Sequence, residues 1–131
     1  MNRVGEAAPD FAAVPAVVRP IVDAARATVR AVAPRAEELA CQSKKPRSKS
    51  MMWKLVRYAV GGEVVVTIGT FSRHSNLFFA RGSEIVDAHG LLEGTGKSLR
   101  YITLRTPADA KSAGVKAIVR KAFALVAKRE A

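Results

Sequence analysis

Two apolar runs separated by a pair of glycines restrict the fold of this 131-residue chain more than any other feature. The first run covers residues 52–60 and the second covers residues 64–68, with Gly61 and Gly62 between them. Two-residue hairpin turns need positive φ angles, which glycine adopts without steric cost, and β-branched side chains favour strands. The segment therefore predicts an antiparallel hairpin, and its unbroken valines indicate a central strand that is covered on both faces.

An amphipathic helix is expected before this hairpin. Between Pro15 and Pro34, apolar residues recur at steps of three and four, and charged residues occupy the opposite side. Pro20 fits the first helical turn, where its missing amide proton has no intrahelical partner, and Pro34 ends the helix. Residues 37–40 are expected to add one more helical turn before a polar, exposed loop.

Two further strands are expected after the hairpin. Residues 76–80 form the third apolar run, and residues 99–105 alternate in the way that a strand with two different faces requires. Between them, residues 83–88 predict a short helical turn. Residues 90–97 hold three glycines and predict a loop with special backbone angles.

A last helix is expected to begin at Thr106. That residue offers a capping hydroxyl, Pro107 suits the first helical position, and Asp109 lies near the positive end of the helix dipole. Apolar residues then follow at helical spacing to about Lys128. Gly114 weakens the first turns by up to about 1 kcal/mol, so a late start is expected.

The order of helix, strands and helix, without βαβ alternation, predicts an α+β fold. We expect a small antiparallel sheet of about four to five strands, flanked by an N-terminal and a C-terminal helix. The length suits one domain, at residues 15–131, after a flexible lead-in at residues 1–14. No apolar run approaches the length of a membrane helix, and charges interrupt the N-terminal segment where a signal peptide would be apolar. A cytoplasmic location without membrane contact is therefore expected.

The charge balance indicates an anionic partner. The chain has 22 Lys and Arg against 11 Asp and Glu, a formal net charge of +11. Such a field attracts nucleic acids and small anionic metabolites alike, so it does not choose between them. The single cysteine, Cys41, excludes an intrachain disulfide and a multi-cysteine zinc site.

Cationic and aromatic side chains beside glycine-rich turns predict a ligand groove. Its cations would hold a small anion, and an aromatic ring would provide an apolar wall. The five candidate residues are His74, Phe79, Arg81, Lys97 and Arg100. The sequence assembles no acid, base or nucleophile, so it favours a non-enzymatic binding domain with no cofactor and no metal, as a monomer or a homodimer, whose partner is a small anion or a protein.

Residues 94–98 contain the Gly-Lys-Ser triplet of phosphate-binding loops. The complete motif needs a glycine at position 91, where this chain has Leu91, and a helix must follow it. A strand is expected here instead, so the sequence argues against an ATP-binding loop.

Nucleic-acid binding through a basic loop is the alternative. Cations beside aromatic rings suit single strands, because phosphates pair with the cations and bases stack on the rings. The residues of this second candidate site are Lys44, Lys45, Arg47, Lys49 and Trp53.

Three segments of the chain have distinctive motifs: residues 31–38 (AVAPRAEE), residues 71–82 (FSRHSNLFFARG) and residues 90–100 (GLLEGTGKSLR). Together these segments resemble the YdhG-like domain family. The family is largely a domain of unknown function, and the resemblance implies a small α+β fold. Some members are described as frataxin-like iron chaperones, so the resemblance also implies an intracellular iron carrier as a further alternative. That role needs clustered oxygen ligands, whereas the acids of this chain are scattered.

Overall fold

The computed structural model describes residues 14–40 and 53–130. It shows an α+β fold, in which a five-stranded antiparallel sheet has the strand order β1-β2-β3-β4-β5. The strands are β1 (Glu37–Ala40), β2 (Trp53–Val60), β3 (Glu63–Thr70), β4 (Ser75–Phe79) and β5 (Arg100–Leu104). The helical elements are α1 (Arg19–Val32), the short 3-10 helix η1 (Gly82–Glu84), α2 (Pro107–Ala110) and α3 (Ala113–Glu130).

The glycine-linked hairpin is confirmed and forms the middle of the sheet. Gly61 and Gly62 have φ angles of 56° and 85°, and the register pairs Val60 with Glu63 across the turn. β3 lies between β2 and β4, and its residues Val66 and Ile68 are fully buried. The turn chemistry thus agrees with the pairing, whereas the expectation that β3 is covered on both faces is wrong for the described residues, because α1, α2 and α3 pack on one face of the sheet.

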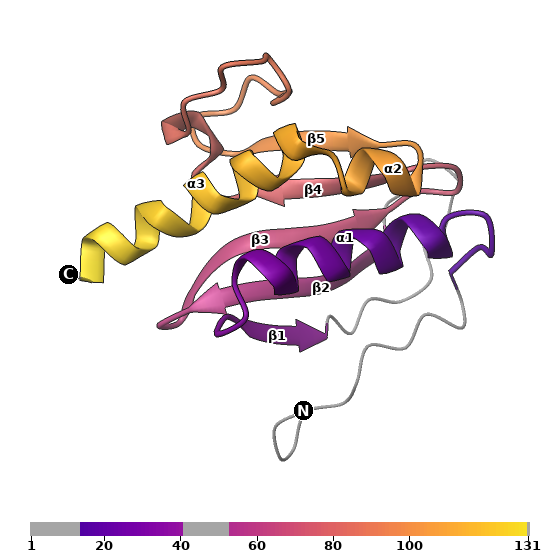
Figure 1. Ribbon diagram of the computed structural model, residues 1–131, viewed down its shortest axis with the longest axis horizontal. Helices are drawn as coiled ribbons and strands as arrows, with labels where there is room; N and C mark the ends of the chain where they lie inside the picture. The colour runs from indigo at the N-terminus through magenta and orange to yellow at the C-terminus, as the bar shows by residue number, and fades with distance from the viewer. Residues whose placement is uncertain (1–13, 41–52, 131) are drawn as a thin grey trace.

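The core lies between the sheet and its helices, which cover one face of it (Figure 1). An aligned cross-strand row faces this layer, and its members are Val56, Ile68, Leu77 and Ile102. Helix residues complete the core, among them Val22, Val29, Val119 and Val126. In residues 14–40 and 53–130, the three α-helices all lie on this side of the sheet (Figure 1).

The expectation of a helical turn at residues 37–40 is wrong. The segment is strand β1, which pairs antiparallel with β2 in a register that joins Glu38 to Tyr58. The carboxylate of Glu38 also accepts hydrogen bonds from Arg26 of α1 and from the Tyr58 hydroxyl. Long-range pairing therefore overrides the local helical preference of these residues.

The C-terminal helix is divided. Thr106 caps α2 as expected, through a reciprocal pair of bonds with Asp109, but this helix ends at Ala110. A second helix begins at Ala113, and the Ser112 side chain accepts a hydrogen bond from the amide of Val115. A Cβ at Gly114 would lie 2.7 Å from a methyl group of Leu91, which belongs to the glycine-rich loop before β5. Glycine at this position therefore lets the first turn of α3 pack directly against that loop.

Two smaller expectations need adjustment. Val14 is 2% exposed and belongs to the core, although we expected a flexible lead-in through that residue. The helical turn expected at residues 83–88 is the shorter η1, which begins one residue earlier. Among the described residues, no helix combines the length and the apolar character that crossing a bilayer requires.

Candidate functional site

The face of the sheet that carries no described helix presents aromatic and cationic side chains. On β4, Leu77 and Phe79 are fully buried on the helix side, so the alternating residues Asn76 and Phe78 point to the opposite side. We call this surface the helix-free face. Register and turn contacts assign to it Arg57, Thr67, Gly69, Phe71, His74, Asn76, Phe78, Tyr101, Thr103 and Arg105.

One aromatic pair joins β4 and β5 on this face. Phe78 and Tyr101 lie directly opposite each other, with ring centroids 5.8 Å apart and ring planes inclined by 43°. Both side chains are partly exposed. The same cross-strand row continues through Thr67 on β3 to Arg57 on β2, which is exposed.

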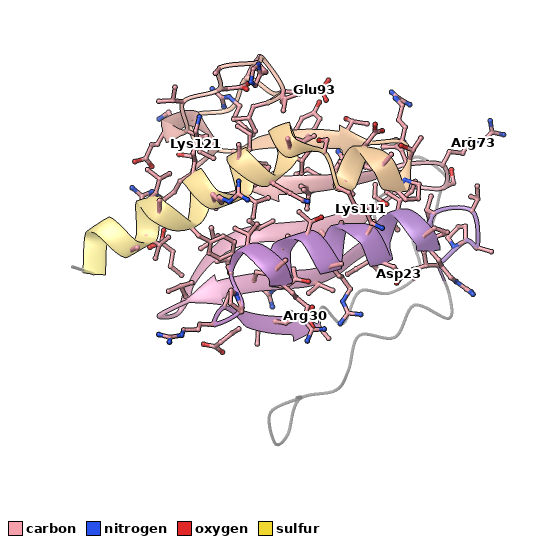
Figure 2. The ribbon with its side chains drawn as sticks, viewed as in Figure 1. Asp23, Arg30, Arg73, Glu93, Lys111 and Lys121 are labelled. Atoms are coloured by element: carbon pink, nitrogen blue, oxygen red, sulfur yellow. The ribbon has the colours of Figure 1, made fainter. Side chains whose placement is uncertain are left out.

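A second ring pair lies in the turn between β3 and β4. The amide of Phe71 donates a 2.8 Å hydrogen bond to the carbonyl of His74, and the two rings stack with centroids 4.5 Å apart. Burial lowers the pKa of His74, and the charge of Arg105 lowers it further. Figure 2 shows Arg73 projecting away from the sheet at this end of the molecule.

A row of smaller side chains separates the two ring pairs. It consists of Gly69, Asn76 and Thr103, which are paired across three strands. Phe78 follows His74 by four residues, so the backbones of these two residues lie about 13 Å apart at roughly 3.3 Å per residue. The face therefore has an aromatic patch near each end of β4.

The glycine-rich loop borders the helix-free face. Glu93 pairs with Tyr101 as an isolated antiparallel bridge outside β5, and its carboxylate accepts a 2.8 Å bond from Thr103. Gly94 has a φ angle of 111°, and a Cβ there would lie 3.4 Å from the Tyr101 ring. The exposed Lys97 follows on the same loop.

An aspartate holds the start of this loop. The two carboxylate oxygens of Asp87 accept bonds of 2.9 and 2.7 Å from the amides of Leu91 and Leu92. Burial alone would raise the pKa of Asp87, but these backbone donors outweigh it and the net pKa is lowered. The loop that we expected from its glycines is thus an ordered border of the face.

The five residues of the expected anion groove lie in different surroundings. His74 lies in the turn directly before β4, whereas Arg81 and Arg100 lie near the other end of that strand. Phe79 is fully buried against α3, so it offers no wall to a ligand at the surface. Only Lys97 among the five is exposed to solvent.

The two arginines of that prediction already have partners. Arg81 forms a double hydrogen bond with Glu84, with distances of 2.7 Å, and lies 3.7 Å from a carboxylate oxygen of Glu63. Arg100 donates to the carbonyls of Gly96 and Leu99 and so closes its own loop. Both guanidinium groups therefore stabilise turns in the structure.

The basic loop residues lie outside the described residues; these are Lys44, Lys45, Arg47 and Lys49. Trp53 begins β2 and pairs with Thr70. Sequence reasoning missed Phe78, Tyr101 and Arg57 as site residues. Their alternation with buried neighbours was a usable signal, but it does not say which side of the sheet the helices cover.

The other polar clusters have structural roles. Arg26, Glu38 and Tyr58 connect α1, β1 and β2, with the Tyr58 hydroxyl 2.6 Å from the Glu38 carboxylate. Burial raises the pKa of Tyr58 far above its usual value, and the bond to Glu38 raises it further. Within the described ranges, no group of three or more His, Cys, Asp or Glu side chains is placed to hold a metal ion.

A depression of about 270 Å³ lies between η1 and α3. Ile85, Val86 and Leu125 form its apolar part, and Glu84 and Lys121 carry its charges. The Lys121 ammonium group, labelled in Figure 2, donates to the carbonyl of Val86. The volume is below that of ordinary small-molecule pockets, so the helix-free face is the stronger candidate.

Comparison of the chain with protein-family models, curated proteins and solved structures found no match. The resemblance to the YdhG-like family therefore stays a prediction from sequence motifs, as does the iron-carrier role that it implies.

Proposed function

We propose that this chain is a cytoplasmic, non-enzymatic domain that binds single-stranded nucleic acid on its helix-free face. The observation that carries the proposal is the Phe78–Tyr101 pair, which is partly exposed on a sheet face that no described helix covers. The net charge of +11 supplies attraction for a polyanion.

The ring pairs match what single-stranded bases need. Unpaired bases expose their faces and stack on aromatic side chains, at about 1–3 kcal/mol per base. Aromatic side chains on an open antiparallel sheet bind RNA in this way in known modules. Bases inside a duplex are already stacked, so two separate ring pairs on one face favour single strands.

Cations lie where a phosphate backbone would cross the face. Arg57 lies at the β2 side, Arg105 adjoins His74, Arg73 projects from the turn, and Lys97 lies on the bordering loop. None of these four forms an ion pair with a described residue. Glu93 is the acid at this border, and a hydrogen bond from Thr103 occupies it.

Substitution of the ring pair tests the proposal. We expect Phe78→Ala and Tyr101→Ala each to weaken binding of a fluorescent twelve-nucleotide single strand by about tenfold, because each removes a stacking surface. Fluorescence anisotropy at several salt concentrations measures the affinity. Arg57→Ala should also reduce the salt slope by about 0.7, the contribution of one phosphate contact in a single strand.

Arg120→Ala provides the matched control, because it removes one exposed positive charge from α3. We expect its affinity to fall less than that of Arg57→Ala, although both variants have the same net charge. Circular dichroism confirms that each variant is folded. Unchanged binding by folded Phe78→Ala and Tyr101→Ala would contradict the proposal, as would equal losses for the two arginine variants.

A further inference from the structure

Asn76 lies at the centre of the helix-free face. It follows His74 by two residues and precedes Phe78 by two, so it lies between the two ring pairs on the same side of β4. The residue is 5% exposed. Its cross-strand neighbours are Gly69 and Thr103.

The side-chain oxygen of Asn76 has no hydrogen-bond partner among the described residues. Buried polar atoms are nearly always paired, so an unpaired one calls for an explanation. Its two cross-strand neighbours offer no donor, because Gly69 has no side chain and the Thr103 hydroxyl donates to Glu93. An acceptor without a partner is thus held between two surfaces that suit bases.

We infer that Asn76 selects the base in the proposed interface, and that it favours adenine. The inference rests on the proposed function. A base stacked on Phe78 and Tyr101 has one edge directed toward the middle row, where Asn76 lies. Adenine presents an amino donor beside the N7 acceptor, and an asparagine amide pairs with both at once.

Thymine lacks that pair of groups, because its corresponding edge presents a carbonyl and a methyl group. A small rotation of the side chain on binding, of the kind common at interfaces, brings the Asn76 amide to the base edge. The unpaired oxygen then gains a donor that the free protein does not supply.

The test compares oligo(dA) and oligo(dT) of eight nucleotides. We expect the unmodified chain to bind oligo(dA) about tenfold more tightly than oligo(dT). Because purines also stack more extensively, a preference alone does not identify Asn76. In Asn76→Ala the ratio should fall to about two or less, through weaker binding of oligo(dA) with oligo(dT) affinity unchanged.

Two further variants make the result decisive. Asn76→Thr keeps a residue that favours strands and replaces Asn76→Ala if the alanine variant does not fold. Arg120→Ala changes an exposed residue of α3, outside the helix-free face, and should leave the ratio unchanged. Equal binding of both oligonucleotides by the unmodified chain, or an unchanged ratio in folded Asn76 variants, overturns the inference while the proposed function stands. Failure of the unmodified chain to bind either oligonucleotide overturns both.

Discussion

Gly82 shows how one residue fixes the end of the sheet. A Cβ at this position would overlap the Arg100 side chain and lie 2.8 Å from the Arg100 backbone nitrogen. The absence of a side chain lets η1 lie directly against the start of β5. Arg100 is thereby held where its guanidinium group closes the glycine-rich loop.

We predict that Gly82→Ala lowers the free energy of unfolding by about 1–3 kcal/mol, because overpacking forces the backbone to shift. Urea denaturation measures the change. Gly96→Ala is the control, since a Cβ at Gly96 meets only the Leu99 carbonyl oxygen, at 3.8 Å, and its effect should stay within about 0.5 kcal/mol. Equal effects of the two substitutions would show that the close approach has no energetic weight.

At the residue scale, local chemistry was predictable and distant partners were not. Gly61 and Gly62 predict their turn because a positive φ is a local requirement, and Thr106 predicts its cap for a similar reason. The sequence does not reveal that Glu84 and Glu63 both pair with Arg81, since Glu63 lies on β3, far from Arg81 along the chain. An arginine therefore seemed free for a ligand when the fold already used it.

The short strand β1 depends on contacts from two other elements. Glu38 receives two bonds from Arg26, twelve residues away, and one from Tyr58, twenty residues away. A four-residue edge strand has few ladder bonds of its own, so these side-chain bonds fasten it to α1 and β2. The same distances explain why a local pattern suggested a helical turn here.

The hydrogen bonds of Glu38 with Arg26 and Tyr58 make the stability of the fold depend on pH in the acidic range. Burial alone would raise the Glu38 pKa, but the hydrogen bonds and charges around it outweigh this, and the net pKa lies below the ordinary 4.5. The contribution is fully present above the unfolded-state pKa and is lost as the pH falls through the lower folded pKa. We predict that the melting temperature drops more steeply below about pH 4.5 in the unmodified chain than in Glu38→Gln.

Thermal melts between pH 7 and pH 3 measure this difference. At pH 7, Glu38→Gln should cost about 1–2 kcal/mol, because it weakens a charged hydrogen bond. Tyr58→Phe removes one donor to the same carboxylate. The fall of its melting temperature with pH should be intermediate between that of the unmodified chain and that of Glu38→Gln. Parallel pH profiles for all three proteins would contradict the role given to Glu38.

The strands β4 and β5 show what alternation reveals at the element scale. The alternation expected over residues 99–105 is observed, because Ile102 and Leu104 are buried whereas Tyr101 and Thr103 are partly exposed. The pattern separates two faces but leaves open which one the helices cover. Because α1 and α3 pack on the side of the sheet where Ile102 lies, Phe78 and Tyr101 on the other side stay partly exposed.

For the whole molecule, the order of elements was sufficient to predict the class of fold. Helix, strands and helix lead to an antiparallel sheet with helices on one face, and this architecture is observed. The proposed site was harder to foresee, because its rows join residues from β2 to β5 and the turn between β3 and β4. Arg57 and Tyr101 share one cross-strand row only through the pairings of β2 with β3, β3 with β4 and β4 with β5.

The two-layer arrangement also separates two ways of attracting a polyanion. A net charge of +11 draws nucleic acid to any basic surface, including the arginines of α1 and α3. Base stacking needs accessible rings, and the partly exposed Phe78–Tyr101 pair lies on the opposite face. The place where the single-stranded nucleic acid binds therefore distinguishes specific binding from nonspecific electrostatic attraction.

Nuclear magnetic resonance titration of the ¹⁵N-labelled chain with a short single-stranded oligonucleotide tests this most directly. We predict that the largest amide shifts fall on Phe78, Tyr101 and their neighbours in β3 to β5, and that they persist at moderate salt. Shifts confined to exposed arginines such as Arg30 and Arg120 on the helices, vanishing as salt rises, would contradict the assignment of the helix-free face as the nucleic-acid-binding surface.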